Sequence, residues 1–242
     1  MDTKITESDN YAELIKYFMD EFPIELIIGN IAPKNNLEII ALEISNRVID
    51  IQTIFERIEN YPTYFKDLYA PENKNIPEGD VLEYHIHSYL NDFYSLEQKI
   101  IRLLRFIGNK LSKFNIGNPD DVRNLLKHLE SQTENGLGQV VGIRGAHIHN
   151  RSVKDSEIAT GRIILQAIAF ANFDDVRKKL LEQKYKDIIK TSKEKYITQS
   201  NDNNTELKKF KNFFACRLGH IIASLYGHDT TRFVKAIKEE NL

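Results

Sequence analysis

The fold class is decided by DVLEYHIHSYLNDFYSLEQKIIRLLRFIGNKLSKF, residues 80–114. Apolar residues recur three or four positions apart along this whole stretch, which is the spacing of one face of an α-helix. The members of this apolar stripe are Leu82, Ile86, Tyr89, Leu90, Phe93, Leu96, Ile100, Leu103, Leu104 and Ile107. The pattern predicts a long helix that buries one side in a core.

The same periodicity continues on both sides of this stretch. It predicts further helices over residues 11–22, 37–58, 119–130, 157–171, 173–196 and 207–226. Proline at Pro62, Pro71 and Pro77 predicts a broken connection over residues 61–79, and the polar run QSNDNNT predicts a loop over residues 199–205. Because no run alternates as a strand would, we expect an all-α protein.

The two predicted connections divide the chain into three parts. We expect an N-terminal helical region over residues 1–79, a helical bundle over residues 80–198 and a C-terminal helical extension over residues 199–242. Connections of this kind, rich in proline or in small polar residues, are where domain borders usually fall. The long stripe at residues 80–114 belongs to the central part, which is therefore expected to hold the main core.

Composition narrows the class of protein. The chain has 242 residues, of which 41% are hydrophobic and 28% are charged, a balance that supports a globular core. The single cysteine, Cys216, excludes an internal disulfide and a cysteine-based zinc site. The net charge of -2 lacks the basic footprint of a general nucleic-acid binder but leaves local basic patches open. The polar first residues do not resemble a signal peptide, and no stretch reaches ~18 apolar residues, so we expect a cytoplasmic protein.

The segment with the highest density of side chains suited to acid–base catalysis and phosphate binding is IRGAHIHNR, residues 143–151. It combines Arg144, His147, His149 and Asn150 in a part of the chain that is too polar and too rich in glycine for a core. A histidine with a pKa near neutrality can take a proton from a 2′-hydroxyl or give one to a leaving 5′-oxygen. An arginine can stabilise the charge that builds on the phosphate oxygens. Such a pair permits RNA cleavage without a metal ion.

An arginine, four intervening residues and a histidine resemble the motif of the HEPN superfamily, and the resemblance covers roughly residues 80–172. It implies an all-helical bundle with the motif between helices, and two protomers whose motifs line one cleft. It further implies a metal-independent endoribonuclease without a cofactor, in a toxin–antitoxin or anti-phage defence system, with RNA as substrate and an antitoxin or defence protein as partner. Arg144 would then clamp the phosphate and His149 would act as acid or base, while His147 and Asn150 would position the phosphate or fix the imidazole tautomer.

A second match to the same motif lies upstream, in RNLLKH, residues 123–128. Here Arg123 is followed by an asparagine, three residues and His128, which is the commoner form of the HEPN motif. The leucines of this segment make an amphipathic stripe, however, so we expect Arg123 and His128 to flank an ordinary helix in contact with solvent. The pair Arg144 and His149 is therefore the favoured site, and the upstream pair is the alternative.

Two other functions stay open. The first is a non-catalytic HEPN-like module that binds a nucleotide or a protein, which Gly145 and the acidic net charge favour. The second is a metal-dependent hydrolase built on the two His-Ile-His triplets, at residues 85–87 and 147–149. The spacing opposes a metal site, because residues two apart on a helix point about 200° apart, whereas metal-binding histidines on a helix stand three or four apart.

Overall fold

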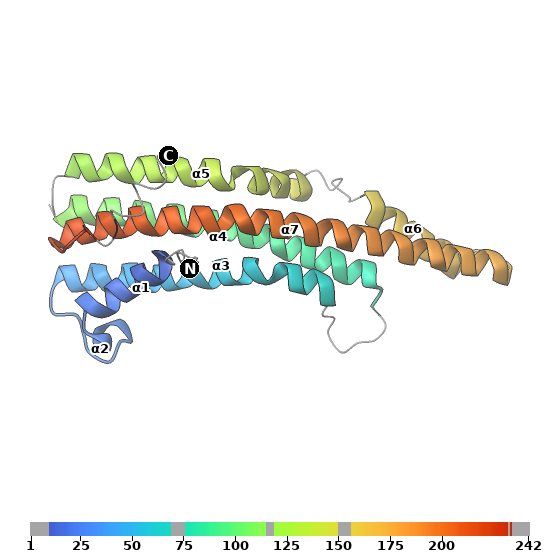
Figure 1. The fold of residues 1–242 in the computed structure, drawn as a ribbon, viewed down its shortest axis with the longest axis horizontal. Helices are drawn as coiled ribbons and strands as arrows, with labels where there is room; N and C mark the ends of the chain where they lie inside the picture. The colour runs from blue at the N-terminus through green and yellow to red at the C-terminus, as the bar shows by residue number, and fades with distance from the viewer. Residues whose placement is uncertain (1–9, 69–75, 115–118, 150–155, 232, 234–242) are drawn as a thin grey trace, which may run out of the picture. The chain divides into compact units, whose positions relative to one another are not determined.

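The computed structural model of this chain describes residues 10–68, 76–114, 119–149, 156–231 and 233 (Figure 1). Every helix or strand assigned in this part of the chain is an α-helix, which confirms the predicted all-α fold. The helices are α1 (Asn10–Glu21), α2 (Ile24–Ile27), α3 (Asn36–Asp67), α4 (Glu78–Phe114), α5 (Pro119–His149), α6 (Ser156–Phe170) and α7 (Asp175–Tyr226). Among the described residues, none of these helices is both long enough and apolar enough to span a membrane.

The chain forms two compact units, each assembled from separate segments. Unit 1 comprises Met1–Phe55, Ser95–Leu137 and Glu206–Leu242, and unit 2 comprises Glu56–Tyr94 and Gly138–Thr205. Four of the helices, α3, α4, α5 and α7, contribute one part to each unit. Each unit therefore takes its core from helices that are far apart in the sequence.

The apolar stripe of α4 is buried along its length, as its periodicity predicts. All its members have at most 8% of their surface exposed. In unit 1, Leu96 and Leu103 lie on the same helix face and are fully buried, and in unit 2 Leu82 is fully buried as well. Burial of each such side chain stabilises the fold by about 1.5–3 kcal/mol. The stripe of α4 therefore supplies the cores of both units.

Local hydrogen bonds define where helices of unit 1 begin and end. Before α3, the Asn35 side chain accepts a hydrogen bond from the Glu38 amide at 2.9 Å, and the Glu38 carboxylate accepts one from the Lys34 amide at 2.6 Å. The Asn35 side chain thereby satisfies an amide group of the first turn, and the Glu38 carboxylate binds the amide of a residue before the helix. At the other end of the chain, Gly227 follows α7 with φ 68°, and its amide donates to the Ser224 carbonyl at 3.2 Å. A glycine in this left-handed conformation is a common helix terminator.

The predicted loop at residues 199–205 is wrong, because these residues belong to α7. Ser200 is fully buried, and its hydroxyl donates to the Ile197 carbonyl at 3.0 Å. The Asn203 side chain donates to the Tyr89 hydroxyl of α4 at 2.8 Å. Small polar side chains favour turns when they have no other partners. Here they find partners within the helix and on a neighbouring helix, so tertiary contacts override the local preference.

Helix α5 is also longer than predicted, because it continues past residue 130 to His149. The glycines of this segment do not end the helix, and one of them permits close packing. At Gly136, a Cβ atom would lie 3.1 Å from the ring of Phe210 on α7, also in unit 1. The small residue therefore lets α5 and α7 approach closely there. The segment after residue 130 is therefore helical despite its glycines, and one of them, Gly136, contacts the neighbouring helix.

Helix α3 is also longer than predicted. It was expected to end at residue 58, before Pro62, and it continues through that proline to Asp67. Tyr61 and Phe65 flank Pro62 and are 5% and 0% exposed, so the packing of these rings holds the last turns in place. The cost of proline inside a helix is offset here by burial of aromatic surface.

Candidate functional site

The predicted motif lies in the last turns of α5, which ends at His149. Arg144, His147 and His149 are therefore helical, whereas the resemblance implies a motif in the segment between two helices. The next helix, α6, begins at Ser156, so the motif directly precedes the connection between α5 and α6. Asn150 lies outside the described residues, and of the other three residues the structure describes the backbone alone. Their places on the helix can still be derived from its register.

The helical register decides which motif positions share a face of α5. Positions three apart differ by about 60° around the axis, so Arg144 and His147 lie on one face. Positions five apart differ by about 140°, so His149 lies further around the helix from Arg144. The two histidine positions differ by about 200°. Within one chain, a continuous helix therefore brings Arg144 closer in register to His147 than to His149.

The alternative pair, Arg123 and His128, lies on the described part of α5. Both side chains are exposed. Arg123 donates through Nη2 to the Ser112 hydroxyl of α4 at 2.5 Å and lines a hollow between the two helices, whereas His128 is not part of that lining. The two positions are again five apart and differ by about 140° around the axis. The helix therefore does not bring this arginine and this histidine to one point within a single chain.

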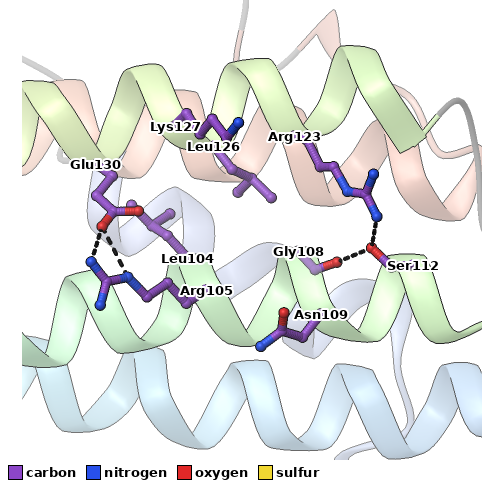
Figure 2. Close-up of a pocket in the computed structure, with 9 residues that line it drawn as sticks. All are labelled: Leu104, Arg105, Gly108, Asn109, Ser112, Arg123, Leu126, Lys127 and Glu130. Carbon is purple, nitrogen blue, oxygen red and sulfur yellow. Dashed lines mark hydrogen bonds and ion pairs between the residues drawn. The ribbon is translucent and has the colours of Figure 1, made fainter.

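The hollow between α4 and α5 lies in unit 1 and has a volume of about 320 Å³ (Figure 2). It is lined by Leu104, Arg105, Gly108, Asn109, Ser112, Arg123, Leu126, Lys127 and Glu130. Three of these nine residues have cationic side chains, and Glu130 is the one carboxylate among the nine. Figure 2 shows Arg123 reaching from α5 towards Ser112 on α4, and Arg105 reaching towards Glu130 at the other end of the hollow. The lining therefore carries a surplus of positive charge.

Hydrogen bonds hold two sides of this hollow in place. Arg105 Nε donates to the Glu130 carboxylate at 2.9 Å, and this hydrogen bond together with the charge of Glu130 raises the pKa of Arg105. The Ser112 hydroxyl accepts from Arg123 and donates to the Gly108 carbonyl at 2.8 Å. Arg123 belongs to the upstream motif, whereas Arg105 and Lys127 were not predicted as site residues. Their positions in two amphipathic helices were visible, but which helix faces meet could not be read from either helix alone.

The first His-Ile-His triplet, on α4 in unit 2, has two histidines with different surroundings. His85 is 8% exposed and its ring stacks on Tyr64 with centroids 6.1 Å apart. His87 is about half exposed, and its Nε2 lies 4.0 Å from the Glu83 carboxylate. Within the part of the chain that the structure describes, no three His, Cys, Asp or Glu side chains gather in a way that could hold a metal ion. His85 packs as a core residue and His87 contacts an acidic neighbour one turn away.

Unit 2 exposes large apolar side chains on α6 and on the first turns of α7. We call these the α6–α7 patch: Ile163, Phe170, Val176 and Leu180, which are 65%, 89%, 79% and 70% exposed. Ile163 and Phe170 are seven apart on α6, and Val176 and Leu180 are four apart on α7, so each pair shares a helix face. The two helices run antiparallel in Figure 1, with Gly161 against Tyr185 and Glu157 hydrogen-bonded to Ser192. Four large apolar side chains are therefore exposed on two neighbouring helices of unit 2.

No protein-family model matches the chain, and neither a curated protein nor a solved structure matches it. The structure thus provides three features that bear on function. They are the arginine and histidines at the end of α5, the cationic hollow in unit 1 and the α6–α7 patch in unit 2.

Proposed function

We propose that this protein is a metal-independent endoribonuclease of the HEPN type, with Arg144 and His149 in its active site. The observation that carries the proposal is the grouping of one arginine and two histidines in the last turns of α5, within an all-α fold. This grouping contains the residue types that RNA cleavage by 2′-hydroxyl attack requires. The resemblance to HEPN proteins extends the proposal to a role in toxin–antitoxin or anti-phage defence, acting on cytoplasmic RNA.

The proposed reaction needs one base, one acid and one cation. His149 takes the proton from the 2′-hydroxyl, whose oxygen attacks the adjacent phosphorus atom. The bond from phosphorus to the 5′-oxygen breaks, and that oxygen receives a proton as it leaves. Arg144 stabilises the charge on the phosphate oxygens through its planar fork of N–H donors. The products are a 2′,3′-cyclic phosphate and a 5′-hydroxyl.

A second copy of the chain completes the proposed site. One histidine cannot give and take a proton in the same step, so a pair of motifs from two protomers supplies both roles. The α6–α7 patch supports this arrangement, because its four apolar side chains are 65–89% exposed in the single chain. The patch also begins on α6, the helix that follows the motif in the chain. A homodimer that buries this patch would bring two copies of the same segment to one interface.

The register of α5 places Arg144 closer to His147 than to His149 around the helix axis. In a dimer, Arg144 of one protomer can serve His149 of its partner. Within one protomer, His147 is better placed to fix the arginine or the phosphate. His149 is therefore proposed as the acid or base, and His147 and Asn150 as positioning residues.

The test is cleavage of mixed single-stranded and structured RNA by the full chain in EDTA. The variants are Arg144→Ala, His149→Ala, His147→Ala and, as the matched control, His128→Ala. We expect cleavage by the wild type, its loss in Arg144→Ala and His149→Ala, a partial loss in His147→Ala and no change in His128→Ala. Loss in His128→Ala alone would move the site to the upstream motif. The absence of cleavage by the wild type on every RNA would favour a non-catalytic binding module.

A further inference from the structure

We infer that the cationic hollow between α4 and α5 in unit 1 binds a phosphodiester group of an RNA strand and so holds the substrate outside the catalytic motif. The inference rests on the proposed function, because that function makes RNA the ligand. The hollow is built entirely from unit 1, whereas the motif residues Arg144 to His149 belong to unit 2. It is therefore a second contact for RNA on the same chain.

The charges that line the hollow favour an anion. Arg105 forms an ion pair with Glu130, which accounts for the one carboxylate of the lining. The other two cations of the lining are Arg123, which donates a hydrogen bond to Ser112, and Lys127, which forms no ion pair among the described residues. Both lie on α5 four positions apart, so they share one face, about 6 Å apart along the helix axis. Two neighbouring cations on one face can contact the oxygens of a phosphate from two sides.

The neutral groups of the hollow suit a phosphate as well. Asn109 offers an amide, and Ser112 offers the hydroxyl that accepts the Arg123 hydrogen bond and directs this guanidinium over the hollow (Figure 2). Contacts from Arg, Lys, Ser and Asn side chains are the common ones to nucleic-acid phosphates. Such contacts position a strand without reading its sequence.

The shape and lining favour the backbone of a strand over a base. The apolar lining consists of two leucines, and none of the nine lining residues is aromatic. Proteins that hold single-stranded bases stack them on aromatic rings, and the hollow offers no such ring. Asn109, Arg123 and Lys127 are exposed, so a strand passing over the surface can reach them without entering a closed pocket.

The test measures RNA binding apart from cleavage. His149→Ala serves as the background that prevents cleavage, and fluorescence anisotropy reports the affinity for a labelled single-stranded RNA over a range of salt concentrations. The double variant Arg123→Gln/Lys127→Gln in this background removes two phosphate contacts. Each lost contact lowers the salt slope for single strands by about 0.7, so the slope should fall by about 1.4 and the affinity by about 25-fold at about 0.1 M salt.

The matched control is Lys208→Gln/Lys209→Gln, which removes two positive charges from an exposed part of α7 in unit 1. It should leave the affinity and the salt slope close to those of the background. Equal RNA affinity in the two double variants, or no RNA binding at all, would overturn the inference. If wild type still cleaved RNA, the proposed function would survive that failure. A loss specific to the Arg123 and Lys127 variant, in a chain that cuts no RNA, would support the hollow and count against the endoribonuclease.

Discussion

Replacing Phe170 by aspartate should separate the proposed homodimer into monomers. Phe170 is 89% exposed and is the most exposed member of the α6–α7 patch. Burying a phenylalanine side chain contributes about 1.5–3 kcal/mol, and a twofold interface contains the residue twice, so the loss is about 3–6 kcal/mol. This corresponds to a dissociation constant about a hundredfold to ten-thousandfold higher. Two aspartates brought close together add repulsion to this loss.

Sedimentation velocity measures this effect directly. The wild type should sediment at twice the chain mass of 28.1 kDa, and Phe170→Asp should sediment at the mass of one chain. The matched control is Ile28→Asp, which changes an apolar residue that is 60% exposed in unit 1, and it should remain a dimer. A dimer of unchanged affinity in Phe170→Asp would refute the role of this patch. A wild-type chain that stays monomeric at high concentration would refute the dimer itself.

Two further predictions concern the helix packing of unit 1. Gly219→Ala should lower the free energy of unfolding in urea by about 1–3 kcal/mol, because the new Cβ atom would overlap the Phe233 ring. The control is Gly138→Ala, where a Cβ atom meets no neighbouring atom. Equal stability of the two variants would argue against the close packing of Gly219 on Phe233. Burial and, to a smaller extent, the charge of Glu134 raise the pKa of Glu97 above its usual 4.5. The native state therefore keeps this proton to a higher pH than the unfolded chain does, and the free energy of unfolding falls as the pH rises through the raised pKa. Glu97→Gln should therefore be more stable than the wild type at about pH 7 and equal to it below about pH 4, and a difference independent of pH would contradict this cause.

The long helices could be predicted from the sequence wherever burial follows periodicity. The stripe of α4 is the clearest case, because each predicted apolar position is buried. The helix limits could not be predicted where partners come from distant segments. Asn203 stays helical with a hydrogen bond to Tyr89, and Gly136 stays helical while it faces Phe210. Local propensity contains no information about such contacts.

The candidate sites were predictable to different degrees. The sequence reveals which residues can do chemistry, such as Arg144 and His149, because their types and spacing are visible. It does not reveal that residues 143–149 are helical, which changes which of them share a face. Nor does it reveal the hollow in unit 1, because Arg105 and Lys127 belong to two helices whose facing sides become known only once they pack.

The chemistry of the RNA ends tests the central claim most directly. Wild-type protein and His149→Ala are incubated with a labelled RNA in EDTA, and the ends of the products are identified by mass spectrometry. Attack by the 2′-hydroxyl predicts 2′,3′-cyclic phosphate and 5′-hydroxyl ends from the wild type and none from His149→Ala. Products with 5′-phosphate ends, or the same products in equal yield from His149→Ala, would contradict the account.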